Sequence, residues 1–191
     1  MTPPLPAHLL ESLAAAAVAE GLADAVFTRV ATPLGRLLVA QGPAGVVRIG
    51  FPEEAEDRLL AEVAGLLGPR VVASDAELAG TTGALSAYLE GDSDRLELPV
   101  DLRLVHAPFR RAVLDTLHAD VPRGEVVTYA ALAARAGRPR AARAAGSACA
   151  RNPVPIIVPC HRVVPGAGGV GSYAGGPARK RELLALEGAP V

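Results

Sequence analysis

The chain has 191 residues, of which half are hydrophobic and only 3% are aromatic. This length allows one ordinary domain or two small ones, and the core must be built mainly from Ala, Val and Leu. No apolar run approaches the ~18 residues that a membrane-spanning helix needs. The Ala-rich stretch from Leu13 to Ala19 lacks a basic leading segment, so we interpret it as a helix and not a signal peptide. We therefore expect a soluble protein of the cytoplasm.

The formal net charge of −1 hides opposite charges in the two halves of the chain. Residues 1–100 contain six Arg, no Lys and fourteen acidic residues, a balance of −8. Residues 101–191 contain twelve Arg, one Lys and six acidic residues, a balance of +7. This split favours a second half that faces a polyanion. The alternative is that two oppositely charged surfaces dock on each other, and charge alone does not decide between them.

The first half predicts an antiparallel β-meander with helices. Three short runs rich in Val, Leu or β-branched residues are separated by two turn-like segments; the runs are 26–31, 36–40 and 45–50. Helical patterns follow at 53–67 and at 75–90, the latter with Asp75 as its N-cap. Residues 96–104 alternate apolar and polar side chains, as in a strand or an extended connector.

The second half predicts a mostly helical unit. Helices are expected over 109–119, 129–136, 140–150 and 177–187, with Thr128 as an N-cap and Gly137 as a terminator. The two central helices, joined by a short Gly-containing turn, form a helix-turn-helix pattern. Residues 153–165 are too rich in proline for a helix and lead into a glycine-rich loop at 166–176. The fold class is therefore α+β with two domains, 1–104 and 105–191, divided where the charge changes sign.

The strongest local signal for chemistry is Pro159-Cys160-His161-Arg162. A cysteine beside histidine and arginine has an electropositive setting that lowers the pKa of a thiol. Neighbouring residues on an extended strand point to opposite sides, so His161 reaches Cys160 only if the chain turns, which Pro159 allows. The alternative is a buried cysteine beside a surface histidine. Cys149 lies in an Ala-rich helix without ionic neighbours, and we interpret it as a packing residue.

Two further segments suggest binding. Small residues fill most positions of the helix at 140–150, which would let its backbone approach another helix or a nucleic-acid groove, and Arg140 and Arg143 supply cations for phosphates. The alternative is a close-packed helix pair in an Ala-rich protein. The loop at 166–176 is either a ligand cradle or a mobile connector. It lacks the spacing of a nucleotide-binding P-loop.

Together these segments resemble the O6-alkylguanine-DNA alkyltransferase family over residues 108–188. The resemblance rests on six spaced motifs: Gly124-Glu125-Val126-Val127-Thr128-Tyr129, Ala141-Ala142-Arg143-Ala144, Arg151-Asn152-Pro153, Pro159-Cys160-His161-Arg162-Val163-Val164, Gly171-Ser172-Tyr173-Ala174-Gly175-Gly176 and Leu186-Glu187-Gly188. It implies an RNase H-like α/β domain with a structural role at 1–104 and a catalytic, DNA-binding domain at 105–191.

The resemblance also implies the chemistry. Cys160 is expected to accept the alkyl group irreversibly, activated through a water by His161 and Glu187. Tyr129 is expected to promote flipping of the base and to donate to the guanine, and Asn152 to brace the active-site segment. The expected substrate is O6-alkylguanine in double-stranded DNA, with O4-alkylthymine as an open alternative.

Contacts with DNA are implied in the same way. Arg143 is expected to enter the duplex from the minor groove and fill the gap left by the flipped base. Its neighbours at the DNA surface would be Arg140, Ala142, Arg151 and Thr128. The flipped base would contact Val163, Tyr173, Ala174 and Gly175. Several relatives have serine where this chain has Ala174, so only a backbone contact is retained there.

Some relatives bind structural zinc in the first domain, but this chain has no cysteine before Cys149, so no metal is expected. No cofactor is expected either, and the protein is expected to act as a monomer without an obligate protein partner. Two rival functions remain open: a DNA-binding module without enzymatic activity, and a Cys-His hydrolase. Transfer of one alkyl group per chain would separate the proposed activity from the first, and repeated turnover on an ester or a peptide would favour the second.

Overall fold

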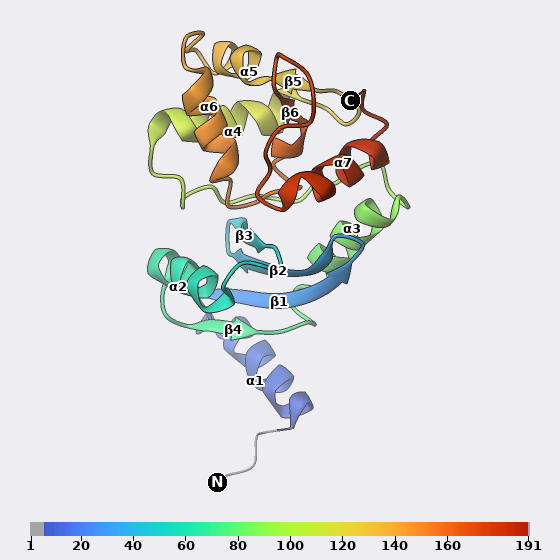
Figure 1. Ribbon diagram of the computed structural model, residues 1–191. Helices are drawn as coiled ribbons and strands as arrows, with labels where there is room; N and C mark the ends of the chain where they lie inside the picture. Colours follow the sequence, from blue (N-terminus) through green and yellow to red (C-terminus); the bar gives the residue numbers. More distant parts are fainter. Residues whose placement is uncertain (1–5, 191) are drawn as a thin grey trace.

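Residues 6–190 are described by a computed structural model. A β-sheet with three helices is formed by the first half of the chain, and a group of helices formed by the second half lies against the sheet (Figure 1). The predicted α+β class is confirmed. The two-domain division at residue 105 stays a prediction, because a buried cluster of apolar side chains runs without interruption from Leu34 in the first half to Leu183 in the second.

The sheet contains the predicted antiparallel meander. Its strands are β1 (Ala25–Thr32), β2 (Gly35–Gly42) and β3 (Gly45–Gly50). A fourth strand, β4 (Val71–Ala73), pairs in parallel with β1 and gives the order β3-β2-β1-β4. The sequence pattern did not predict β4, because three residues are too few to show an alternation.

Three helices belong to the first half: α1 (Ala7–Ala19), α2 (Glu56–Leu67) and α3 (Ala79–Glu90). The prediction that Asp75 caps the last of these is wrong, because α3 begins four residues later, after Leu78. Asp75 instead accepts a hydrogen bond from the buried Thr28 hydroxyl on β1. Its side chain therefore joins the segment before α3 to the sheet.

A connector without regular strand structure links the two halves. Within residues 96–104 the single pairing is an isolated bridge between Val100 and Val46. Val46 N–H donates to the Pro99 carbonyl at 2.8 Å, and Asp101 N–H donates to the Val46 carbonyl at 2.8 Å. The connector is thus held to the edge strand β3 before the chain enters the second half.

The second half contains α4 (Pro108–Asp120), α5 (Tyr129–Arg135), α6 (Ala142–Ala150) and α7 (Gly176–Leu186), with short elements β5 (Val127–Thr128), η1 (Cys160–Arg162) and β6 (Val163–Val164). The predicted cap of α5 is confirmed, since Thr128 Oγ1 accepts from Ala131 N–H at 3.1 Å. Helix α6 begins at Ala142, so Arg140 lies in the preceding turn.

Two further findings concern residues 6–190. None of the helices in this part of the chain is long and apolar enough to cross a membrane. In the same range, no group of three or more His, Cys, Asp and Glu side chains is placed to hold a metal ion.

Replacement of Gly45 by Ala should destabilise the fold. Gly45 has a φ of +125°, and a Cβ there would lie 2.3 Å from the Pro99 carbonyl oxygen of the connector. Strain at such a backbone position costs about 1–3 kcal/mol, and the contact with a backbone atom adds to it. Urea denaturation should show an unfolding free energy lower than that of the wild type by at least that amount.

Gly65→Ala is the matched control. A Cβ at Gly65, inside α2, meets nothing within 4 Å, and alanine favours a helix by about 0.5–1 kcal/mol over glycine. This variant should be as stable as the wild type or more stable. The assignment of the Gly45 contact is wrong if both variants unfold at the same urea concentration.

Candidate active site

Cys160 begins a tight turn that follows the proline-rich segment. Cys160 N–H donates to the Val158 carbonyl at 2.8 Å, and Arg162 N–H donates to the Pro159 carbonyl at 2.9 Å, which closes one turn of 3₁₀-helix. The turn required for His161 to lie near Cys160 is therefore present. Cys160 is 2% exposed and His161 is fully buried, so the alternative of a surface histidine is wrong.

Asn152 fixes the segment that carries the cysteine. Its Nδ2 donates to the Val158 carbonyl at 2.8 Å and to Cys160 Sγ at 3.2 Å. Its Oδ1 accepts from Val154 N–H at 3.0 Å. Within this loop Ile156 has a φ of +77°, which is unfavourable for a β-branched residue. The buried amide thus holds a strained loop in the shape that presents the sulfur.

Glu187 lies at the centre of a buried group of hydrogen-bond donors. Its Oε1 accepts from His161 Nε2 at 2.6 Å and from the Tyr88 hydroxyl at 2.5 Å, and its Oε2 accepts from Arg162 Nε at 2.8 Å. Burial favours the neutral acid, but the hydrogen bonds from His161 and Arg162 outweigh it and lower the pKa of Glu187 to about 2. The carboxylate is therefore ionised at neutral pH.

The same arrangement fixes the tautomer of His161. Burial lowers the pKa of His161 and outweighs the opposing effect of Glu187, so the imidazole is neutral at neutral pH. Because the ionised Glu187 only accepts, the single proton of the ring must be on Nε2. The other nitrogen, Nδ1, is buried and has no hydrogen-bond partner among the described residues. It is a proton acceptor held inside the site.

The expectation of a lowered thiol pKa is wrong for the protein without a ligand. Burial raises the pKa of Cys160 to about 11, and the hydrogen bond from Asn152 and the charge of Lys180 offset it only in part. The guanidinium of Arg162 is directed elsewhere, toward Glu187 and the Val121 carbonyl. Cys160 therefore rests as a neutral thiol.

The thiol opens onto a small pocket of about 190 Å³. The pocket is lined by residues of α5, α6 and the glycine-rich loop together with the cysteine: Tyr129, Gly146, Cys149, Ala150, Cys160, Ser172, Tyr173 and Ala174. The Tyr173 hydroxyl is buried without a hydrogen-bond partner among the described residues. A ligand with polar groups would therefore find an unused donor and acceptor there.

Two residues predicted at the base-binding site do not line this pocket. Val163 is buried and its carbonyl accepts from Lys180 Nζ at 2.6 Å. Gly175 lies against Phe51, since a Cβ there would come within 2.7 Å of the ring. Val163 precedes the loop that forms the pocket wall, and Gly175 lies near the end of that loop, packed against Phe51.

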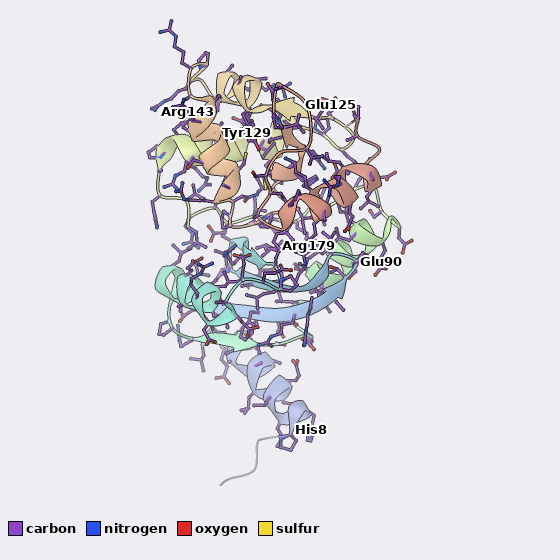
Figure 2. The ribbon with its side chains drawn as sticks, viewed as in Figure 1. His8, Glu90, Glu125, Tyr129, Arg143 and Arg179 are labelled. Atoms are coloured by element: carbon purple, nitrogen blue, oxygen red, sulfur yellow. The ribbon has the colours of Figure 1, made fainter. Side chains whose placement is uncertain are left out.

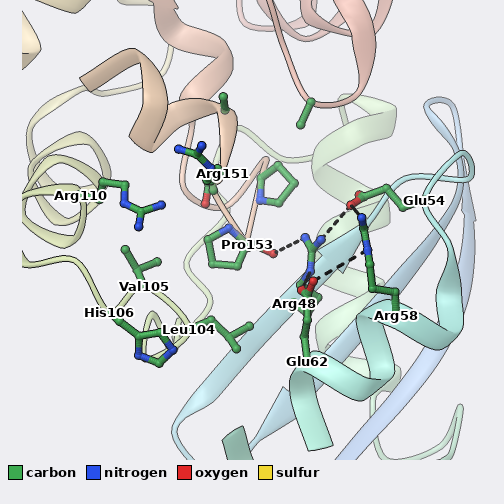
Figure 3. A pocket seen from close by; sticks show the side chains of 14 residues that line it. Arg48, Glu54, Arg58, Glu62, Leu104, Val105, His106, Arg110, Arg151 and Pro153 are labelled. Carbon is green, nitrogen blue, oxygen red and sulfur yellow. Dashed lines mark hydrogen bonds and ion pairs between the residues drawn. The ribbon is translucent and has the colours of Figure 1, made fainter. Parts of the chain in front are cut away.

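A larger cleft of about 630 Å³ lies between the two halves and does not include Cys160 (Figure 3). It shares Ala150 and Ala174 with the smaller pocket. Arg48 lies on its floor, where Nη2 pairs with Glu54 at 2.8 Å and Nη1 donates to the Pro153 carbonyl at 3.3 Å. The larger cavity thus lies along the contact between the two halves, whereas the smaller one contains the nucleophile.

The predicted helix-turn-helix is formed by α5 and α6, and α6 borders the pocket. Arg143 is exposed on α6, and Figure 2 shows it with Tyr129 in the half of the molecule away from the sheet. Arg140 precedes the helix and Arg151 follows it, both exposed. Helix α6 packs against the Tyr129 ring at Gly146, where a Cβ would lie 3.7 Å from the ring, an ordinary van der Waals distance. Ala142 and Thr128, the other predicted DNA contacts, are half-buried.

Sequence reasoning missed three contributors to this site. Tyr88 reaches Glu187 from α3, Lys180 is fully buried behind the loop, and Cys149 lines the pocket although it was interpreted as packing alone. Lys180 stands between Arg179 and Arg181 on α7, and charged neighbours give no local sign of burial. A buried partner far away in the sequence leaves no local signal.

A helix-turn-helix whose second helix borders a pocket with a buried thiol defines a DNA-binding protein that uses a cysteine for chemistry. Residues 108–189 match the family model for the 6-O-methylguanine DNA methyltransferase, DNA binding domain. The human methylated-DNA–protein-cysteine methyltransferase is 41% identical over 172 residues, which cover 84% of this chain and 79% of the human one.

Solved structures agree with these sequence matches. The Mycobacterium tuberculosis O6-methylguanine methyltransferase superimposes with a TM-score of 0.72 at 31% identity, covering 87% of this chain and 96% of that one. A structure of the same organism's protein in complex with DNA gives a TM-score of 0.73 at the same identity and coverage. This chain therefore belongs to the methylated-DNA–protein-cysteine methyltransferase family of DNA-repair enzymes.

The buried Glu187 should make the stability of the fold depend on acid. Its pKa is 4.5 when unfolded and about 2 when folded, so the stabilisation is complete above pH 4.5 and is lost as the pH falls toward 2. That difference corresponds to about 3 kcal/mol. Glu187→Gln should lose less unfolding free energy than the wild type between pH 5 and pH 2, as measured by urea denaturation at each pH.

Glu182→Gln, at an exposed position on the same helix, is the control and should follow the wild type. If the Glu187→Gln profile is as steep as the wild-type profile, the carboxylate is not stabilised by the bonds described above.

Proposed function

We propose that the protein transfers the alkyl group of O6-alkylguanine in duplex DNA to Sγ of its own Cys160, once per chain. The observation that carries this proposal is the buried Cys160 thiol at the end of a pocket that α6 borders. In the reaction an S–C bond forms, the C–O6 bond breaks, and its electron pair stays on the guanine oxygen. The thiol proton must leave as the sulfur attacks.

The proton route proposed here uses the bare nitrogen of His161. A water between Cys160 Sγ and His161 Nδ1 would take the thiol proton, and the charge that develops on the ring would be stabilised by Glu187 at 2.6 Å. Asn152, which already donates to Sγ at 3.2 Å, would stabilise the thiolate. Tyr129 borders the pocket and would donate to the guanine as it acquires negative charge.

The substrate base must leave the duplex to reach this sulfur. The sulfur of Cys160, a residue that is 2% exposed within a pocket, cannot be reached by a base that remains stacked, and extrusion costs a few kcal/mol, less for a weakened pair. Arg143 is exposed on α6, and none of the described residues forms an ion pair with it, so it is available to enter the minor groove and fill the gap. Arg140, Arg151, Ala142 and Thr128 would contact the adjoining backbone.

The loop from Gly171 to Gly176 would hold the extruded base. Tyr173 and Ala174 line the pocket. Ala174 has no hydroxyl, so only its backbone would contact the base. Val163 and Gly175 would act through the loop that they support. O4-alkylthymine also carries its alkyl group on an exocyclic oxygen, and it is the second substrate proposed for this pocket.

The proposed reaction consumes the protein. A thioether has no activated bond to hydrolyse, so Cys160 would not be regenerated, and no cofactor is required because the acceptor is part of the chain. A single chain carries every residue of the proposed site, which favours action as a monomer. A free thiol acceptor persists in the reducing cytosol, so we place the protein there.

Incubation with duplex DNA that contains O6-methylguanine tests the proposal. Mass spectrometry should find one methyl group per chain, mapped to the peptide that contains Cys160, and excess DNA should give no further product. Cys149→Ser is the control: it removes the other thiol of the pocket and should retain transfer, whereas Cys160→Ser should lose it entirely. Continued demethylation by Cys160→Ser, or many lesions repaired per chain, would exclude the proposed reaction.

Tyr129→Phe should separate chemistry from binding. The hydroxyl is proposed to donate to the departing guanine, a contact that matters most in the transition state, so the single-turnover rate should fall about 10- to 100-fold. The dissociation constant for alkylated DNA, measured by fluorescence anisotropy, should change less than threefold, about 0.6 kcal/mol. Equal losses in rate and affinity would assign Tyr129 to DNA binding instead.

A further inference from the structure

The catalytic half of the chain receives one buried hydroxyl from the other half. Tyr88, on α3, is 2% exposed, and its hydroxyl donates to Glu187 Oε1 at 2.5 Å. That oxygen is the one that His161 Nε2 reaches at 2.6 Å. Arg162 Nη2 donates to the same oxygen at 3.1 Å, so three donors share its charge, and among them Tyr88 comes from the first half of the chain.

Tyr88 is held in this position from several sides. The Arg123 guanidinium lies 5.4 Å from the centre of its ring, and Arg123 Nη2 donates to the Leu186 carbonyl, next to Glu187, at 2.6 Å. Arg162 Nη2 donates to the tyrosine oxygen at 3.3 Å. Burial raises the pKa of Tyr88 to about 12, so the hydroxyl keeps its proton and stays a donor at neutral pH.

We propose that Tyr88 is a positioning residue for alkyl transfer, whose hydroxyl limits how strongly Glu187 holds the proton of the His161 ring. The proposal rests on the proposed function of Cys160 and His161. A carboxylate oxygen that already accepts from Tyr88 carries less charge toward His161, which keeps the imidazole neutral and able to take a proton on Nδ1. The first half of the chain thereby takes part in the chemistry and is more than a scaffold.

Among the groups around His161 and Glu187, the Tyr88 hydroxyl is a donor to Glu187 that can be removed without removing a charge. Glu187 also accepts from Arg162, and the charges of Arg162 and Lys180 act on His161 from η1 and α7. The Tyr173 ring meets His161 edge-on, with centroids 6.3 Å apart. Arg162 and Lys180 are also anchored to backbone carbonyls, those of Val121 and Val163. Two other side chains donate to the oxygen that His161 reaches: Tyr88 is neutral and comes from the first half of the chain, whereas Arg162 is a cation from the second half.

Tyr88→Phe is the direct test because it removes one oxygen and retains the ring. Without the competing donor, Glu187 should favour the charged imidazolium, so the pKa of His161 should rise by about half a unit to one unit. NMR titration of the histidine rings should show this shift in the free protein, with the His161 resonance assigned by its loss in His161→Gln. Because this readout needs no DNA, it tests the inference even if no alkyl group is transferred.

The rate of alkyl transfer provides the second measurement. Transfer requires neutral His161, so the rate should fall as the pH drops through the pKa of this histidine. In Tyr88→Phe that fall should begin at a pH higher by the same half unit to one unit, while the rates above it stay within about threefold of the wild type. A purely structural role would lower the rate equally at every pH.

Thr81→Val is the matched control. Thr81 lies on the same helix, is 9% exposed, and its hydroxyl donates to Gln41 at 2.7 Å, away from Glu187. This variant also loses one buried hydroxyl from α3, and it should leave both the His161 titration and the pH profile unchanged. The inference is overturned if Tyr88→Phe leaves the His161 pKa in place, or if Thr81→Val shifts it equally.

Discussion

The hydrogen bonds that surround the buried Glu187 carboxylate join three parts of this molecule. An ionised carboxylate inside a protein must be surrounded by donors, or burial would force it to take up a proton. The donors come from α3 and from the turn that starts at Cys160, whose Arg162 also donates to the Val121 carbonyl just after α4. The cysteine turn, the last helix and the first half of the chain therefore have one common point of attachment.

Because Cys160 rests as a neutral thiol, little of the rate of alkyl transfer can come from thiolate that is already present. A thiol pKa of about 11 leaves on the order of one molecule in ten thousand as thiolate at pH 7. This small thiolate fraction is partly offset, because the thiolate of a thiol with a higher pKa is a stronger nucleophile. The remaining contribution must come from alignment of the sulfur with the alkyl carbon and from proton removal during attack. Burial also shields an acceptor that is used once from other electrophiles.

Local patterns predicted the elements whose signals are local. The turns after β1 and β2, the Thr128 cap and the need for a bend at Pro159 all follow from a few adjacent residues, and the motifs around Cys160 and Glu187 identified the family. The features that failed depend on tertiary packing. Arg162 looked like a cation for the thiol, but the structure directs it to Glu187; Asp75 looked like a cap, but it bonds Thr28 on β1. Tyr88 has no local signal because its partner lies 99 positions away.

The opposite charges of the two halves form ion pairs between the halves, and other arginines of the second half stay exposed. Some arginines of the second half form ion pairs with acidic residues of the first half. Arg179 pairs with Glu53 at 2.8 Å, and Arg123 pairs with Asp94 at 2.7 Å. Figure 2 labels Arg179 between the halves. Others, such as Arg140 and Arg143, remain exposed around α6. Because the acidic first half repels a polyanion, DNA would be attracted only to the face that carries the exposed arginines. Helix α6 also borders the cysteine pocket, so this attraction would bring DNA to the helix beside the thiol.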